Sequence, residues 1–372
     1  MKITRSLPLA LCAALFMWAG CGGHQFWETV NSTSTSSNPT GAVPKFAYAA
    51  NFNGGGAGSV SAYTINSGTG ALTAVSGSPF AAATGTVAAG ADSAGKFVYA
   101  ANQGGGVSAF TITRADGTLV AVSGSPYATG TTPVWVAVDP GARFVYVANG
   151  GSIDISAFAI NSSTGALTGF SSTFPVTAKP LRATVDPSGR FLFVSLGTGG
   201  TEIFKINSDG TLAVVRTVPA APCAASDAVA LDANSRFVFV ADGSTGICNY
   251  AVNASSGDLT LISSTIILAG TNPVAVATGA NGKFLFAANN GSSNLSGFTI
   301  NADGSLTAMS GSPFSVGSSP ADVTVDPSGA FVYVANFSGG SISVFSINSS
   351  NSLSSVGTAT AGTNPNSVVT TQ

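Results

Sequence analysis

The sequence has 372 residues, enough for one large domain, and only 8% of them are charged. Ordinary globular domains have roughly a quarter of their residues charged, so this surface must consist largely of Ser, Thr, Asn, Gly and Ala. So sparse a charge, with a formal net value of −2, excludes an electrostatic site for nucleic acid or acidic lipid. We therefore predict no nucleic-acid partner.

Residues 1–20 have the parts of a secretion signal. Lys2 and Arg5 form its basic start, and an apolar stretch follows that is too short to span a membrane comfortably. The segment Trp18–Cys21 (Trp-Ala-Gly-Cys) resembles the bacterial lipobox. The resemblance implies that Cys21 becomes the acylated N-terminus, so that the membrane is contacted through a lipid anchor only.

The alternative is an ordinary cleavage site next to an incidental cysteine. Lipidation is favoured because an unpaired cysteine is an awkward choice in an oxidising compartment. Gly22 is similar to signals that are sorted to the outer membrane, so we expect an exported, lipid-anchored protein of the bacterial cell envelope, at the outer membrane or cell surface. Residues 21–44 are polar and Ser/Thr-rich, which predicts a flexible tether.

The remainder, residues 45–372, contains seven copies of one short phrase of the type Arg-Phe-Val-Tyr-Val-Ala-Asn. Successive copies are separated by 46 to 51 residues, a period that indicates a repeat architecture. The first aromatic residues of the copies are Phe46, Phe97, Phe144, Phe191, Phe237, Phe284 and Phe331.

Each repeat reads as four short strands. The phrase itself is apolar on both faces, which is typical of a doubly buried strand. A strand such as 133–139 precedes it, and strands such as 58–66 and 70–80 follow it, separated by Asp-Pro-Gly and Asn-Ser-x-Thr-Gly turns. No segment of this region shows a helical period. The pattern predicts an all-β fold, a seven-bladed β-propeller with four antiparallel strands per blade.

The first copy of the phrase lacks a preceding first strand. The last segment, residues 362–369, matches residues 270–277, which precede a copy of the phrase. We therefore predict that the C-terminal strand completes the first blade and closes the ring, which leaves no open sheet edge.

The phrase, within the longer pattern Pro-x-x-Val-x-Val-Asp-Pro-x-Gly-Arg-Phe-Val-Tyr-Val-Ala-Asn, resembles YVTN-repeat propellers and the related seven-bladed lactonase family, which includes 6-phosphogluconolactonase-like proteins. The resemblance covers residues 45–372 and implies a His and a Glu at one mouth of the central channel in members with lactonase chemistry. The third residues of the first strands, which match the family's His position, are Ala88, Trp135, Arg182, Ala228, Ala275, Asp322 and Ser367.

None of these residues is His, and the one His of the chain is His24, in the tether. Lactone hydrolysis needs a general base and a group that stabilises developing negative charge. Asp322 and Arg182 are the acid and the cation of this ring and could pair across the channel, with Trp135 as a third candidate. The alternative is that these side chains line the pore without chemistry.

Two other polar sets recur. Asp92, Asp139, Asp186, Asp232 and Asp326 each occupy a hairpin where Asp commonly caps the turn. The Asn residues that end the second strands could form a sugar-binding ring or hydrogen-bond the following turn. Neither set has the spacing of a metal site, and we predict no metal and no cofactor.

Cys223 and Cys248 are the cysteines that remain if Cys12 is removed with the signal and Cys21 is lipidated. Cys223 precedes the first strand of one repeat and Cys248 begins the third strand. The starts of those strands should be about 9–10 Å apart, but the Pro-rich loop around Cys223 can fold over the second strand. Because an exported protein favours pairing, we predict a disulfide.

The absence of His from the repeat region favours a non-catalytic binding or surface-structural module, with a small molecule, a glycan or an envelope protein as its partner. The alternative is a lactonase-like hydrolase that acts on a sugar lactone. We expect a monomer.

Overall fold

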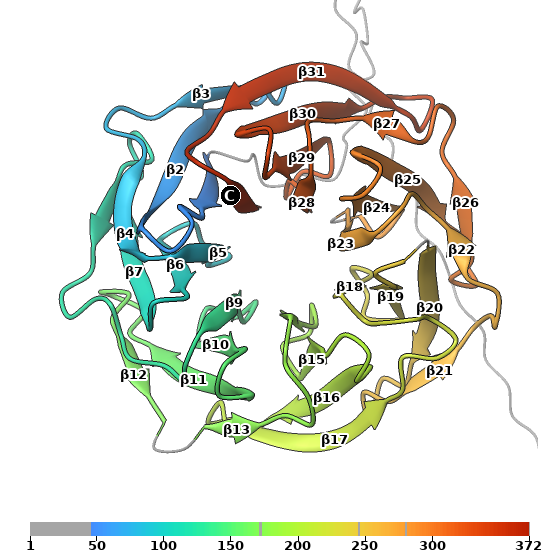
Figure 1. Ribbon diagram of the computed structural model, residues 1–372, viewed down its shortest axis with the longest axis horizontal. Coiled ribbons are helices and arrows are strands. Elements are labelled where there is room, and N and C mark those ends of the chain that lie inside the picture. The colour runs from blue at the N-terminus through green and yellow to red at the C-terminus, as the bar shows by residue number, and fades with distance from the viewer. Residues whose placement is uncertain (1–45, 171–172, 245, 280, 372) are drawn as a thin grey trace, which may run out of the picture. The chain divides into compact units, whose positions relative to one another are not determined.

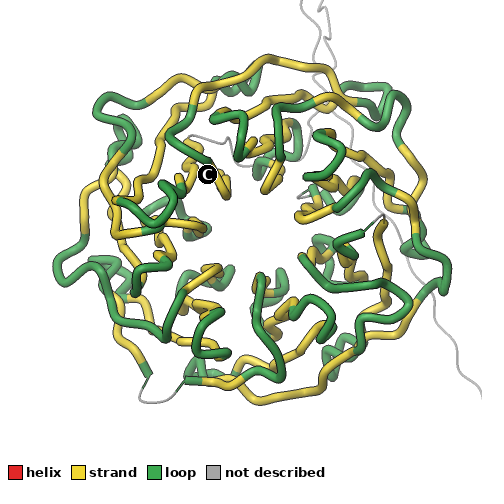
Figure 2. Tube along the Cα trace, viewed as in Figure 1, coloured by secondary structure: helices red, strands yellow, loops and turns green. Residues whose placement is uncertain are grey.

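The computed structural model describes residues 46–170, 173–244, 246–279 and 281–371. Throughout these residues the secondary structure is β, and seven antiparallel sheets are arranged around a central axis (Figure 1). Figure 2 shows that strands and loops alternate around the whole ring. The predicted seven-bladed propeller is confirmed. No helix in the described residues is long and apolar enough to cross a membrane.

Within each blade the strands follow one another outward from the centre (Figure 1). Blade 1 contains β32 (Pro365–Thr370), β1 (Phe46–Asn51), β2 (Ala57–Ile65), β3 (Leu72–Ala74) and β4 (Phe80–Thr84). Blade 2 contains β5 (Thr86–Ala91), β6 (Phe97–Asn102), β7 (Val107–Ile112) and β8 (Leu119–Ala121). Blade 3 contains β9 (Pro133–Val138), β10 (Phe144–Asn149), β11 (Asp154–Ile160), β12 (Leu167–Gly169) and β13 (Phe174–Pro175). Blade 4 contains β14 (Arg182–Val185), β15 (Phe191–Ser195), β16 (Thr201–Ile206) and β17 (Leu212–Val218). Blade 5 contains β18 (Ala228–Leu231), β19 (Phe237–Ala241), β20 (Gly246–Val252), β21 (Leu259–Leu261) and β22 (Ile267–Leu268). Blade 6 contains β23 (Pro273–Thr278), β24 (Phe284–Asn289), β25 (Asn294–Ile300), β26 (Leu306–Ala308) and β27 (Phe314–Ser315). Blade 7 contains β28 (Pro320–Val325), β29 (Phe331–Asn336), β30 (Ser341–Ile347) and β31 (Leu353–Thr360).

The C-terminal strand closes the ring as predicted. Strand β32 pairs antiparallel with β1, with Tyr48 opposite Val369 and Ala50 opposite Ser367. Blade 1 therefore combines its innermost strand from the end of the chain with outer strands from its beginning (Figure 1).

The fourth strand of several blades differs from the continuous strand that the sequence predicts. In blade 1 the segment is divided into β3 and β4, and both pair with β2. Gly77, at φ 82°, turns the chain between them, and the following Pro79 has no N–H for a ladder hydrogen bond. Blades 3 and 5 are divided in the same way without this Ser-Gly-Ser-Pro turn, whereas the outer strands β17 and β31 of blades 4 and 7 are continuous.

Neighbouring blades are joined through the repeated aromatic residues. The buried Tyr48 hydroxyl of blade 1 donates to the carbonyl of Gly117 in blade 2, at 3.0 Å. A Cβ at Gly117 would lie 2.4 Å from the ring of Phe46, so this left-handed turn position, at φ 82°, must remain Gly. The same hydroxyl contact recurs in the pairs Tyr99–Gly165, Tyr146–Gly210 and Tyr333–Gly70.

The repeated Asp residues cap hairpins. One carboxylate oxygen of Asp139 accepts the backbone N–H of Phe144 at 2.8 Å, and the other accepts Nε of Arg143 at 3.0 Å. Asp232 does the same with Phe237 and Arg236. These contacts account for the acidic positions structurally, as the turn interpretation requires.

Candidate functional site

The structure brings together the three predicted candidates, which lie on the innermost strands of three different blades. Arg182 in β14 forms a salt bridge with Asp322 in β28, with 2.8 Å between Nη1 and Oδ1. Its Nη2 donates to the carbonyl of Ala321 at 2.6 Å. The guanidinium carbon lies 4.1 Å from the ring centre of Trp135 in β9. These contacts join blades 3, 4 and 7 across the channel.

Asp322 also ties in the closing strand. Its second oxygen, Oδ2, accepts the backbone N–H of Val368 in β32 at 3.0 Å. Burial raises the pKa of the Asp322 carboxyl, while Arg182 and the Val368 N–H oppose that rise. The carboxylate is therefore held by partners on two blades, and it is fixed rather than free to accept a proton from a substrate.

Two cavities lie along the channel. One, of about 140 Å³, is lined by Trp135, Arg182, Ala228 and Asp322 together with residues that follow them on the innermost strands. The other, of about 370 Å³, is lined by later residues of these strands. Trp135 lines both cavities, as do Thr184, Thr324 and Val369, so the two cavities adjoin each other.

Asp227 is a candidate that the sequence analysis missed. It immediately precedes β18, one residue before the position that was compared with the family's His. Burial raises the pKa of its carboxyl above the usual range, with Asp242 acting in the same direction and Arg182 opposing it. The signal in the sequence was a charged residue at the second strand position, where other repeats have mainly apolar residues: Val87, Val134, Leu181, Val274, Ala321 and Asn366.

Three glycines lie at the channel mouth beside these residues. Gly150, Gly197 and Gly243 follow Asn149, Leu196 and Asp242, the corresponding residues of blades 3, 4 and 5. A Cβ at Gly243 would lie 2.5 Å from Oδ2 of Asp227, so a larger residue there would displace the carboxylate. A Cβ at Gly150 would lie 2.9 Å from Val134 and 3.2 Å from Cε of Lys179.

The other four blades have larger, partly exposed side chains at the position of these glycines. Blades 1 and 7 place Phe52 and Phe337 there, with ring centres 6.4 Å apart and an angle of 27° between the rings. Blades 2 and 6 have Gln103 and Asn290, and Nδ2 of Asn290 donates to the carbonyl of Pro320. At this position the channel mouth therefore has glycines on the side of Asp227 and larger side chains, two of them aromatic, on the other side.

The Asn residues at the ends of the second strands have structural roles. In blade 3, Nδ2 of Asn149 donates to Oγ of Ser156 at 2.9 Å. Both side chains are buried, so they are inaccessible to a sugar. The equivalent pairs are Asn51–Ser61, Asn102–Ser108, Asn289–Ser296 and Asn336–Ser343.

In four of the five pairs the serine also accepts a backbone N–H of the incoming loop. Oγ of Ser156 accepts the N–H of Gly130, three residues before β9. Ser61 and Ser343 do the same for Gly362 and Gly317. In blade 4 the buried Glu202 takes this position and accepts the N–H of Thr177 at 2.8 Å.

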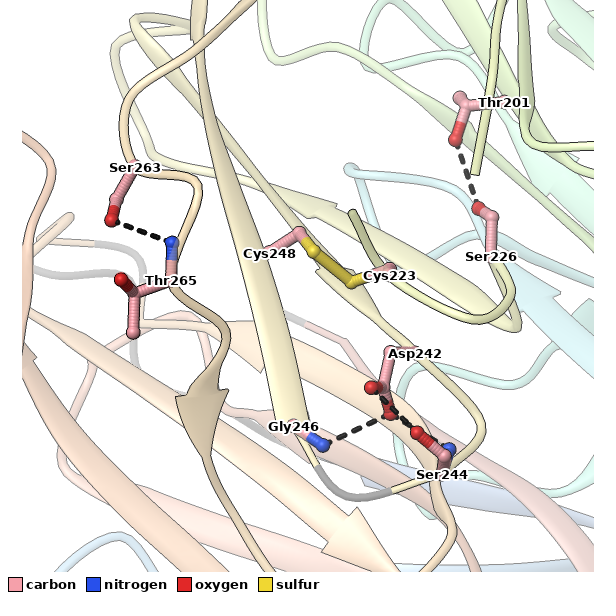
Figure 3. The surroundings of a disulfide bond; sticks show 9 residues. All are labelled: Thr201, Cys223, Ser226, Asp242, Ser244, Gly246, Cys248, Ser263 and Thr265. Carbon is pink, nitrogen blue, oxygen red and sulfur yellow. Dashed lines mark hydrogen bonds between the residues drawn. A yellow bond between two sulfur atoms is a disulfide. The ribbon is translucent and has the colours of Figure 1, made fainter. Parts of the chain in front are cut away.

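In blade 5 a disulfide takes the place of this hydrogen bond. Cys248 occupies the serine position and is bonded to Cys223 at an S–S distance of 2.02 Å, with 6.1 Å between the Cα atoms (Figure 3). Both residues are almost fully buried. The loop that the disulfide fixes leads directly to Ser226, which hydrogen-bonds Thr201, and to Asp227. The structure thus contains the predicted pairing.

No group of three or more His, Cys, Asp and Glu side chains suited to a metal ion occurs in the part of the chain that the structure describes. His24 and Cys21 lie outside the described residues. The candidate site therefore consists of the carboxylate of Asp227, the guanidinium of Arg182, which is paired with Asp322, and the ring of Trp135.

Comparison with known families identifies the chain. The model of the family described as lactonase, 7-bladed beta-propeller, matches residues 99–228, 204–313 and 238–371. The chain belongs to this lactonase family. No curated protein matches the sequence significantly.

Solved structures similar to this lactonase-family propeller include two described as putative 6-phosphogluconolactonases. The one from Bacteroides fragilis is 19% identical with a TM-score of 0.73 and covers 90% of this chain and 99% of its own. The one from Bacteroides uniformis is also 19% identical, with a TM-score of 0.74 and coverage of 88% and 99%. A periplasmic gluconolactonase of Pseudomonas aeruginosa is 19% identical, with a TM-score of 0.68 and coverage of 88% and 98%. At these identities the similarity shows the fold.

Proposed function

We propose that this lactonase-family propeller hydrolyses a lactone at the mouth of its channel. The observation that carries the proposal is Asp227, a partly buried carboxylate with a raised pKa, which lies near Arg182 and against Gly243 at the channel mouth. Family membership and the names of the similar structures support the same chemistry. This function departs from the non-catalytic role that the sequence favours.

Asp227 would act as the general base. A carboxylate with a raised pKa accepts a proton from water more readily than an ordinary one. The hydroxide so formed would attack the lactone carbonyl, and the ring C–O bond would then break. The proton on Asp227 would return to the leaving alkoxide, so that the carboxylate is regenerated and water is the only co-reactant.

Arg182 would stabilise the oxyanion. A guanidinium has five N–H donors, and two contacts, to Asp322 and to the carbonyl of Ala321, are made by its terminal nitrogens. The salt bridge and the ring of Trp135 fix its position before substrate arrives. A donor held in place in this way needs no rearrangement as charge develops.

A second candidate is a binding module without turnover. It is favoured by the engagement of Arg182 with Asp322, which neutralises the cation, and by the lack of His in the described residues. Its ligand would be a small molecule, a glycan or an envelope protein. We further propose export and a lipid anchor at Cys21 in the bacterial envelope for either function, supported by the sequence of residues 1–21.

The test is hydrolysis of a panel of sugar lactones by the full chain. The rate is measured as the release of protons while the pH is held constant. We expect turnover that Asp227→Asn reduces by about 10²-fold or more, the usual contribution of a general base. Lys283→Gln, on the hairpin of blade 6, is the matched control. Turnover unaffected by Asp227→Asn would remove the assigned base, and binding without turnover would support the second candidate.

A further inference from the structure

The charges near the channel mouth are poorly suited to a phosphorylated ligand. The end of the channel at which the innermost strands begin has two nearby cations, Lys179 and Arg182, among the described residues. Arg182 is paired with Asp322 at 2.8 Å, so the pair carries no net charge, although the guanidinium keeps N–H groups that can donate hydrogen bonds. Lys179, the other cation, is exposed. Asp227 and Asp242 add negative charge at the same end. A phosphate is normally held by Arg or Lys donors, and the acids would repel it.

The wall opposite Asp227 is apolar. Phe52 and Phe337 stack on each other and remain partly exposed, whereas the equivalent positions of blades 3, 4 and 5 are glycines, and the side chain of Asp227 lies against Gly243. Phe52 also packs against the core cluster that includes Val87 and Ala88 at the start of β5, so the ring is supported from behind. An aromatic pair of this kind offers an apolar contact surface rather than donors for sugar hydroxyls.

We infer that the ligand of this site is a lactone that carries an apolar substituent and no phosphate. The inference rests on the proposed function. The ester ring would lie on the side of blades 4 and 5, next to Asp227 and Arg182, and an alkyl or aryl substituent would contact Phe52 and Phe337. It assigns a substrate class that differs from the phosphogluconolactone and gluconolactone in the names of the similar structures.

Binding of non-hydrolysable lactams tests the inference independently of turnover. The full chain would be titrated calorimetrically with lactams that bear methyl, butyl or hexyl chains, and with a lactam that bears a phosphate. Each buried methylene is expected to tighten binding by about threefold to fourfold. The phosphate is expected to weaken binding or leave it unchanged. Equal affinity along the alkyl series, or tighter binding of the phosphate by about tenfold, equivalent to about 1.4 kcal/mol, would overturn the inference.

Variants locate the contact. Phe52→Ala and Phe337→Ala should flatten the dependence of affinity on chain length. Phe80→Ala, in β4 on the outer part of blade 1, should preserve it. A steep dependence retained in both mouth variants would also overturn the inference. If a mouth variant fails to fold, the wild-type series still decides the ligand class.

The lactones of the same alkyl series separate this inference from the proposed function. Graded lactam affinity with no lactone hydrolysis would leave the ligand class standing and contradict the hydrolase. Hydrolysis that is independent of chain length would support the hydrolase and contradict the ligand class.

Discussion

Cys223 and Cys248 form a covalent bond at the position where other blades use a hydrogen bond between a serine and the backbone of the incoming loop. The bond closes a segment of 25 residue steps, for which chain-entropy arguments give about 3 kcal/mol of stabilisation. Because the disulfide and the hydrogen bond occupy equivalent positions, their contributions to the free energy of unfolding can be compared within one protein.

We predict that Cys223→Ala/Cys248→Ala lowers the free energy of unfolding by about 3 kcal/mol. Cys223→Ala/Cys248→Ser should lose about 0.5–1.5 kcal/mol less, since the introduced hydroxyl could accept the backbone N–H as that of Ser156 does. Urea unfolding of the two variants checks the difference. Thiol counting on unreduced, unfolded wild-type protein should find Cys223 and Cys248 unreactive. If the two variants are equally stable, a serine at position 248 does not replace the disulfide by a hydrogen bond.

The salt bridge between Arg182 and Asp322 gives a second prediction. The side chains of Arg182 and Asp322 are 14% and 9% exposed. Removal of either one therefore leaves the charge of the other buried and without its partner. Asp322→Ala should destabilise the fold by about 3–5 kcal/mol, while Arg182→Met/Asp322→Leu should recover most of that loss. Thermal or urea unfolding measures both. If the double variant is no more stable than Asp322→Ala, the pair is not the source of the loss.

Asp227 should reduce stability at neutral pH. Its folded pKa is raised above the unfolded value, so ionisation is harder in the folded state, and stability falls as pH rises from the unfolded pKa through the folded pKa. Asp227→Asn should therefore raise Tm at pH 7, with a gain that disappears below about pH 3.9, the unfolded pKa. Melting curves across this range test the sign. A gain that grows toward acid pH would refute the assignment.

The same carboxylate sets the pH dependence of turnover. Hydrolysis through Asp227 needs the ionised form, so activity should fall as pH decreases through its raised pKa. The rate profile of kcat/KM should show an acidic limb above the ordinary range for Asp. A profile that stays flat down to about pH 4, near the ordinary pKa of Asp, would be inconsistent with this base.

Membrane attachment through Cys21 remains a prediction from the sequence. Cys21→Ala should release the protein from the membrane fraction and abolish incorporation of labelled fatty acid. Cys12→Ala serves as the control, because Cys12 lies in the signal segment. Equal labelling of wild type and Cys21→Ala would exclude this anchor.

The fold was predictable because a period near 47 residues repeats the same strand and turn chemistry. The pairing of Arg182 with Asp322 was accessible because both occupy the third position of innermost strands. Asp227 was missed because only that position was compared, and its interest arises from burial and from neighbouring charges that no local pattern encodes. The breaks in the outer strands were missed because no single turn motif marks them: Ser-Gly-Ser-Pro lies at the breaks of blades 1 and 6 but not at those of blades 3 and 5.

The composite first blade has a consequence for folding. Strand β1 is made early, but its inner partner β32 is made only after the strands of the other six blades, so the circle cannot be completed until residues 365–370 have been synthesised. Contacts of such sequence separation form slowly, since a long loop must be ordered first. Until then β1 and the innermost part of blade 7 present unpaired surfaces. The nascent protein would depend on being kept apart from its own copies until its closing strand arrives.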